Sequence, residues 1–91
     1  MVTSIILMNA ERTRINDIAG QLQETKGVSE VYSVSGSYDL IAIIRVANND
    51  NLAELVTEKL NRIDGILHTE TMLAFKAYSK HDLESMFALG M

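Results

Sequence analysis

The sequence contains no cysteine, which excludes a disulfide scaffold and a thiolate metal site and is typical of a cytoplasmic protein. Its five glycines are separated from one another, so neither G-x-G-x-x-G nor G-K-[ST] occurs and nucleotide binding through those loops is excluded. The apolar run Ile5 to Met8 is far shorter than a membrane span and has no features of a secretory leader. We therefore expect a cytoplasmic protein without a membrane anchor.

Basic residues are also few and scattered. Eight Lys and Arg stand against twelve Asp and Glu, for a net charge of −4, and the basic residues run from Arg12 to Lys80 without clustering. Phosphate contacts supply most nucleic-acid affinity, so this distribution argues against direct binding of DNA or RNA.

The length of 91 residues predicts a single domain over residues 1–91. Its apolar content of 47% is enough for one core. A domain this small is marginally stable unless something else covers its apolar area, which favours oligomerisation.

Hydrophobic periodicity predicts four strands and two helices. The predicted strands are residues 2–8, 28–35, 39–46 and 66–78. The first helix is predicted over 11–26, and the second follows a polar break in which Asn51 and Glu54 have capping-box spacing. Gly27 and Gly65 stand where glycines usually end helices.

The two halves of the chain resemble each other. A shift of 38 residues superimposes Ile5-Ile6 on Ile43-Ile44 and Lys26-Gly27-Val28 on Asp64-Gly65-Ile66. Two β-α-β halves with right-handed crossovers give a ferredoxin-like α+β fold, an antiparallel four-stranded sheet with two helices on one face.

The sheet face opposite the helices is predicted to be apolar. On the 39–46 strand, Leu40, Ala42, Ile44 and Val46 share one face, while Ile41 and Ile43 lie on the other. Two helices cannot cover both faces, so we expect two sheets to pack face to face in a dimer. After the last predicted strand, the apolar stripe Leu83, Met86 and Phe87 predicts a short C-terminal helix.

Neither catalytic nor metal chemistry is indicated. His68 and His81 lack further ligands at metal-binding spacing, and no serine lies in a strand-turn-helix elbow. We therefore expect no enzyme, no metal and no cofactor.

One local cluster could hold a ligand. In Gly36-Ser37-Tyr38-Asp39, exposed backbone N–H groups suit a carboxylate and Asp39 suits an ammonium group, as in a zwitterion. The alternative is an ordinary hairpin with Tyr38 buried and Asp39 capping the turn. Thr69 and Thr71 lie on one face of the last strand and could hydrogen-bond a ligand, although threonine is also simply a good strand residue.

The same residues resemble a known family. Gly27-Val28-x-x-Val31, Val34-Ser35-Gly36-Ser37-Tyr38-Asp39-Leu40, Gly65-Ile66 and Thr69-x-Thr71 look like the effector-binding (RAM) domain of Lrp/AsnC transcriptional regulators, over residues 2 to 78. Members normally carry an N-terminal helix-turn-helix domain, whereas this sequence starts at the first strand and so resembles the stand-alone RAM proteins.

The resemblance implies a dimeric α/β barrel whose dimers assemble into octamers or similar rings. It also implies binding of an amino acid between dimers, which favours Gly36, Ser37, Tyr38 and Asp39 as ligand-site residues, with Thr69 and Thr71 beside them. Without a DNA-binding domain, such a chain would act by co-assembly with full-length relatives or through another partner.

Two other functions remain open. A small dimeric α/β-barrel enzyme, such as a monooxygenase or isomerase, would need polar groups in a cavity, but the predicted sheet faces are mostly apolar apart from Arg45. An ACT-like amino-acid-binding domain shares the fold and the ligand class, but is not expected to have the Gly-x-Tyr-Asp turn.

Overall fold

The computed structural model describes residues 1–78, so the predicted C-terminal helix lies outside the described residues. Within them, four strands and two helices follow in the order β-α-β-β-α-β. The strands are β1 (Val2–Ala10), β2 (Val28–Ser33), β3 (Leu40–Val46) and β4 (Ile66–Leu73). The helices are α1 (Ile15–Glu24), entered through a 3₁₀ turn at Arg12–Arg14, and α2 (Asn49–Glu54), continued by a π turn at Leu55–Lys59 and a 3₁₀ turn at Leu60–Arg62.

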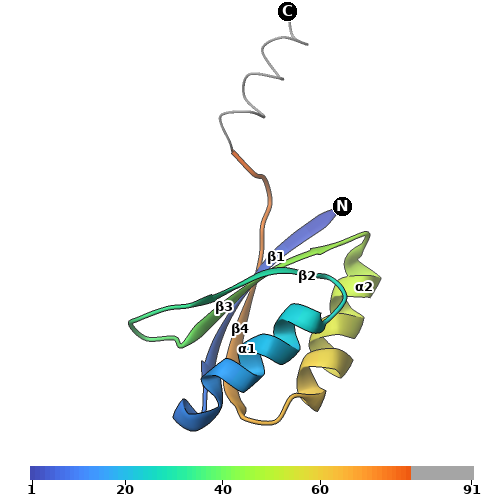
Figure 1. Cartoon of the computed structure of the whole chain (residues 1–91). Coiled ribbons are helices and arrows are strands. Elements are labelled where there is room, and N and C mark those ends of the chain that lie inside the picture. The colour runs from blue at the N-terminus through green and yellow to red at the C-terminus, as the bar shows by residue number, and fades with distance from the viewer. Residues whose placement is uncertain (79–91) are drawn as a thin grey trace, which may run out of the picture.

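The four strands form one sheet in the order β2-β3-β1-β4, and every neighbouring pair is antiparallel. Both helices lie on the same face of this sheet (Figure 1). The two central strands, β1 and β3, are those related by the internal repeat. The predicted ferredoxin-like fold is therefore confirmed.

The core lies between the sheet and the helices and follows the predicted alternation. Most side chains of β1 and β3 that face the helices are buried, and helix residues spaced by three or four positions pack against them. The buried hydrophobic residues are Ile6, Met8, Ala10, Ile18, Leu22, Leu40, Ala42, Ile44, Leu55, Leu60 and Ile63. The buried Ser4 is satisfied because its Oγ donates to the Met72 carbonyl at 2.7 Å.

The helix-ending glycines occupy equivalent positions in the two halves. Gly27 and Gly65 have φ of 100° and 97°, a region that other residues rarely adopt. A Cβ on Gly27 would lie 2.8 Å from Leu55 Cδ1, and one on Gly65 would lie 2.8 Å from Ile18 Cδ1. Each turn therefore needs glycine both for its backbone angle and for its close packing against a helix.

Several predicted boundaries differ from the structure. The first strand runs to Ala10 instead of residue 8, and α1 spans Ile15–Glu24 instead of 11–26. The last strand ends at Leu73 instead of Tyr78, and beyond it the Ala74 N–H still donates to the Thr3 carbonyl at 2.9 Å. The second strand ends at Ser33 instead of Ser35, and the third begins at Leu40 instead of Asp39. The residue composition predicts that a strand is present, whereas the ends of the strand depend on its hydrogen bonds to the adjacent strands.

The start of α2 also differs from the prediction. Its N-cap is Asn48, whose side-chain oxygen accepts a hydrogen bond from the Asn51 backbone N–H at 2.9 Å, so Asn51 donates to the cap instead of forming it. In a run of asparagine and aspartate, several residues can cap equally well. The preceding strand decides which of them has the extended backbone that a cap requires.

We expect Asn48→Ala to lower the free energy of unfolding by about 1 kcal/mol, because an N–H at the start of α2 loses its acceptor. Asn51→Ala is the matched control and should change stability much less, since only its backbone takes part in the cap. Chemical denaturation of both variants tests this. Equal losses would contradict the assignment of the cap to Asn48.

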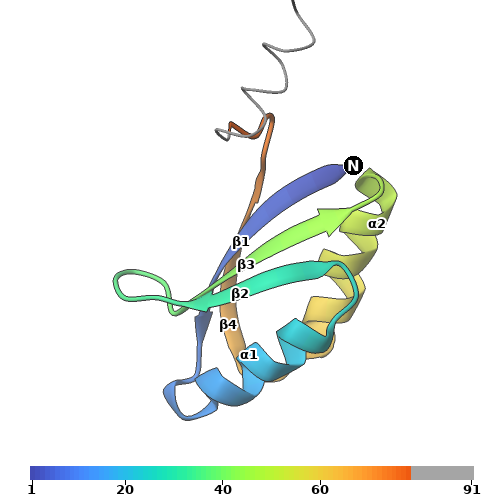
Figure 2. The same ribbon diagram turned by 45° about the horizontal axis from the view of Figure 1, so that its top comes forward.

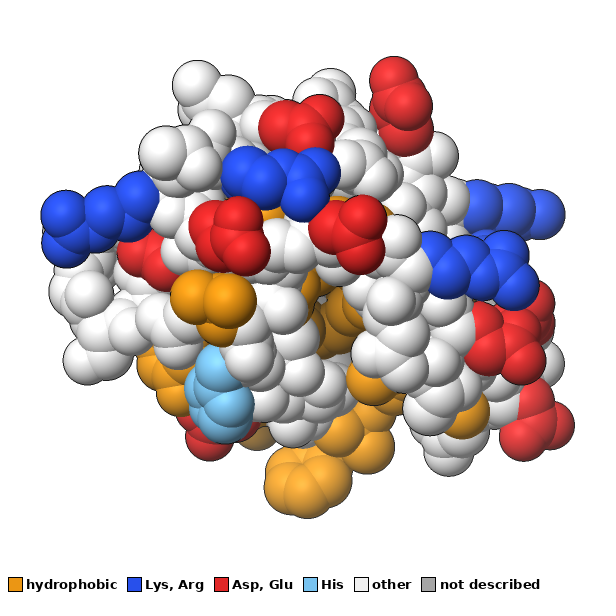
Figure 3. All heavy atoms as spheres, turned by 90° about the horizontal axis from the view of Figure 1, so that it is seen from below, with side chains coloured by type: hydrophobic (Ala, Val, Ile, Leu, Met, Phe, Trp, Pro, Cys, Tyr) orange, Lys and Arg blue, Asp and Glu red, His pale blue; other side chains and the backbone are white. Residues whose placement is uncertain are grey.

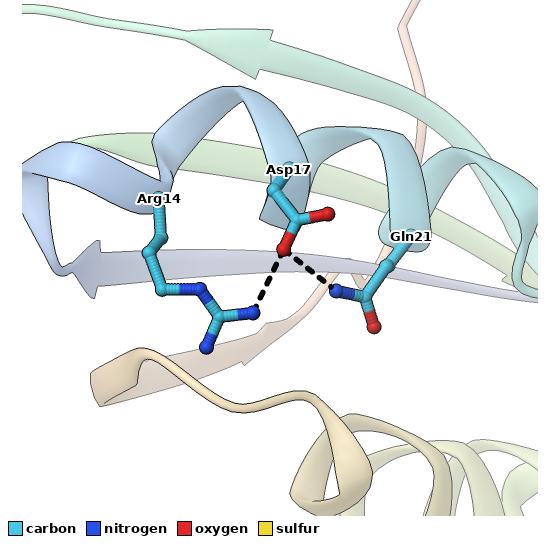
Figure 4. A network of polar contacts seen from close by, with 3 residues as sticks. All are labelled: Arg14, Asp17 and Gln21. Carbon is cyan, nitrogen blue, oxygen red and sulfur yellow. Dashed lines mark hydrogen bonds and ion pairs between the residues drawn. The ribbon is translucent and has the colours of Figure 1, made fainter.

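The start of α1 carries an exposed polar network (Figure 4). Arg14 Nη2 donates to Asp17 Oδ2 at 2.7 Å, and Gln21 Nε2 donates to the same oxygen at 3.2 Å. The hydrogen bond from Arg14 lowers the pKa of Asp17 below its ordinary value. These contacts link successive turns of α1 on its solvent side, where exposed pairs contribute little to stability.

Candidate functional site

The turn between β2 and β3 is fixed by backbone hydrogen bonds at its base. The Val34 N–H donates to the Asp39 carbonyl at 3.0 Å, and the Asp39 N–H donates to the Met8 carbonyl of β1 at 2.9 Å. At its tip, Gly36 has a φ of 111° and no other atom near the position of a Cβ. The tip therefore extends freely beyond the sheet, as Figure 2 shows.

Two side chains attach this turn to the end of β1. Asp39 Oδ2 accepts a hydrogen bond from the Ala10 N–H at 2.9 Å, and Asn9 Nδ2 donates to the Ser37 carbonyl at 2.8 Å. One oxygen of Asp39 is thus already engaged with the backbone. Asp39 has a structural role at the sheet end, as in the hairpin alternative, whatever else it contacts.

Tyr38 links the turn to the edge strand β4. Its hydroxyl donates to Glu70 Oε2 at 2.5 Å, and this hydrogen bond raises the Tyr38 pKa above the ordinary value. Glu70 belongs to β4 and pairs with Leu7 of β1, so the tyrosine reaches across β1 to make this contact. The ring is half-buried, so the hairpin alternative is wrong in expecting a buried tyrosine.

The two threonines lie on the other face of the sheet. Thr69 and Thr71 pair with Met8 and Ile6, whose side chains face the helices, whereas Glu70 between them faces away. Both threonines are exposed, and Thr69 borders a hollow of about 100 Å³ beside the second helix. A single chain therefore brings Gly36, Ser37, Tyr38 and Asp39 together, but not with Thr69 and Thr71.

Glu70 and Asn9 are the site residues that the sequence did not single out. Glu70 stands between the two threonines, and Asn9 ends an apolar strand, so neither belongs to a recognisable motif. Only the strand register places them beside the turn. The one signal available in the sequence was the alternation of side chains along β4, which places Glu70 on the opposite face of the sheet from Thr69 and Thr71.

The sheet face away from the helices, called the open face below, joins this site. Its apolar residues are Ile5 and Leu7 of β1, Tyr32 of β2, Ile41 and Ile43 of β3, and Met72 of β4. No element among residues 1–78 covers them, and Tyr32 and Met72 are 49% and 44% exposed. Tyr38 and Glu70 lie at one end of this apolar surface.

Within residues 1–78, no helix is long and apolar enough to cross a membrane. No group of three or more histidine, cysteine or acidic side chains in that part of the chain could hold a metal ion. On the face shown in Figure 3, acidic and basic side chains are interspersed and hydrophobic side chains gather along one side. That face has no uniformly basic stretch.

The fold, the Gly-x-Tyr-Asp turn and the apolar open face define a small ferredoxin-like α+β domain. Residues 3–83 match the Lrp/AsnC ligand binding domain, and the chain belongs to this family. An uncharacterised helix-turn-helix transcriptional regulator of Pyrococcus furiosus is 37% identical over 59 residues, which are 65% of this chain and 39% of that protein. The matches to such curated relatives span between 39% and 52% of their length.

Solved structures agree with this assignment. TTHA0845 from Thermus thermophilus is 36% identical with a TM-score of 0.82, and the match covers 88% of this chain and 100% of that one. FFRP-DM1 is 33% identical with a TM-score of 0.79, over 82% of this chain and 100% of that one. The feast or famine regulatory protein of M. tuberculosis, solved with L-methionine, is 18% identical with a TM-score of 0.73, over 88% of this chain and 54% of that one, and shares the fold.

Proposed function

We infer that this domain senses a free amino acid, or a similar small effector, by assembling with copies of itself. It would regulate amino acid metabolism or transcription indirectly, without catalysis and without contacting DNA. The observation that carries this proposal is the Gly36–Asp39 turn, which is anchored to β1 and joined to Glu70 at the edge of an apolar sheet face. The L-methionine complex of the M. tuberculosis relative supports the ligand class.

The turn offers complementary groups for an amino acid. Among the described residues, the backbone N–H groups of Gly36 and Ser37 make no hydrogen bond and can receive a carboxylate. Glu70 accepts one hydrogen bond from Tyr38 and has further acceptor sites for an ammonium group. One oxygen of Asp39 is likewise engaged, with Ala10, but Asp39 is half-buried whereas Glu70 is exposed, so Glu70 is the carboxylate better placed for that role.

Assembly would complete the site. A ligand on the open face beside Tyr38 is separated by the sheet from Thr69 and Thr71 of the same chain. If the threonines take part, a neighbouring copy must supply them. This arrangement supports binding of the effector between the dimers of a ring. It is equally consistent with binding where this domain contacts a full-length Lrp/AsnC regulator.

The proposal is tested by titrating each proteinogenic amino acid into the protein by calorimetry while light scattering follows the particle mass. We expect one amino acid, or a small chemically related group, to bind and to change the mass or the melting temperature. Absence of binding across the whole set would contradict amino acid sensing.

We expect Glu70→Gln to weaken that binding by about 10- to 100-fold, because a charged acceptor for the ammonium group is lost. The glutamine side-chain oxygen can still accept the hydrogen bond from the Tyr38 hydroxyl, so the turn keeps its geometry. Glu24→Gln, on the exposed side of α1, is the matched control and should bind as the wild type does. Unchanged affinity in Glu70→Gln would assign the ammonium group to another residue.

A further inference from the structure

A second hollow lies at the opposite end of the sheet from the Gly36–Asp39 turn. There the turn from α1 to β2, the end of β3 and the start of the second helix come together (Figure 2). They enclose a cleft of about 460 Å³ whose lining includes Lys26, Gly27, Arg45, Glu54, Leu55 and Lys59. We call it the basic cleft. Its volume is in the range of pockets that hold small metabolites.

The basic cleft gathers positive charge in a chain that is negative as a whole. Three of the eight Lys and Arg of the sequence line it, against the single carboxylate of Glu54. Within residues 1–78, neither Lys26 nor Lys59 forms an ion pair. Among the described residues, two ammonium groups without an ion pair thus share the cleft with one carboxylate.

Arg45 is only loosely engaged elsewhere. Its Nη1 lies 3.3 Å from Glu30 Oε1, and both side chains are nearly half exposed. Charge-assisted hydrogen bonds of this kind are usually about 2.7–2.9 Å long. Arg45 shares its face of β3 with Ile41 and Ile43, so its guanidinium lies toward the open face and adds positive charge near the cleft without facing its interior.

A backbone hydrogen bond and close packing fix the base of the cleft. The Arg45 N–H donates to the Gly27 carbonyl at 2.9 Å, which fixes the α1–β2 turn against β3. Leu55 is only 1% exposed and packs directly beneath Gly27. The three cationic residues come from three separate segments, so the fold, and not a run of basic sequence, brings them together.

We propose that the basic cleft binds a small organic dianion, with its charged groups between Lys26 and Lys59 and its carbon skeleton against Gly27, Val46 and Ala47. Phosphate monoesters and dicarboxylates share this chemistry. The site is separate from the turn at Tyr38 and does not depend on amino acid binding there.

The test measures thermal stability of the full chain against inorganic phosphate, glycerol phosphate and succinate, with acetate at matched ionic strength as the reference. We expect at least one dianion to stabilise the protein more than acetate does. Lys26→Met and Lys59→Met should each raise its half-saturating concentration about tenfold, because each removes one charged donor. Arg12→Met, an exposed cation outside the cleft, should leave it unchanged.

Amide chemical shifts give the second readout. We expect the dianion to shift the Gly27 and Leu55 signals and to leave Gly36 unaffected. Equal stabilisation by acetate, equal half-saturation in Lys26→Met and Arg12→Met, or shifts centred on Gly36 would each overturn the proposal. Whether glycerol phosphate or succinate binds more tightly identifies the class of dianion.

Discussion

Replacing Gly27 with alanine should lower the free energy of unfolding by about 2 to 5 kcal/mol, a large part of what a small domain possesses. Two costs combine. The φ of 100° is unfavourable for any residue with a Cβ, and the new atom would lie 2.8 Å from Leu55 Cδ1 and 3.0 Å from Val46 Cγ1. Leu55 is fully packed, so its methyl group has little room to move away.

Substitutions at two other glycines distinguish the cost of backbone strain from the cost of the steric clash. Gly36 has a φ of 111° but no neighbour near its Cβ position, so Gly36→Ala should cost only the backbone strain, about 1 to 2 kcal/mol. Gly20 lies in α1 with no atom nearby, and Gly20→Ala should be neutral or stabilise by about 0.5 to 1 kcal/mol. Chemical denaturation gives all three values. A loss for Gly27→Ala no greater than for Gly36→Ala would refute the steric contribution.

Ile43→Glu should convert the assembled protein into single subunits. Ile43 lies in the middle of the open face, beside Ile5 of the neighbouring strand, where the proposed dimer buries it. An unpaired carboxylate buried in an apolar contact costs several kcal/mol, and twofold symmetry places a second one nearby. We expect the dissociation constant of the dimer to rise about 1000-fold or more.

Light scattering during size exclusion measures this, since the subunit mass is 10.1 kDa. The wild type should have a multiple of that mass and Ile43→Glu a single unit, with its circular dichroism retained. Gln23→Glu adds the same charge on the exposed side of α1 and should assemble normally. A wild type that is monomeric at high concentration, or an Ile43→Glu variant of unchanged mass, would show that this face is not the interface.

The turn was the part of the candidate site that could be predicted from the sequence. Gly36 and Asp39 are recognisable because a positive φ and a carboxylate beside a turn leave local signatures. Glu70 and Asn9 left none, because their contacts with Tyr38 and Ser37 join residues distant in the chain. The basic cleft was equally hidden, since its lysines and arginine look scattered in the sequence.

The sequence by itself determined the order of strands and helices, the two equivalent glycine turns and the apolar character of both sheet faces. These follow from side-chain periodicity and backbone stereochemistry, which act over a few residues. Only the tertiary structure decided that Tyr38 meets Glu70, that Thr69 and Thr71 face the other way, and that Asn48 caps α2. Strand register and helix ends are set by packing between distant segments, and one residue of slip would exchange the two faces of β4.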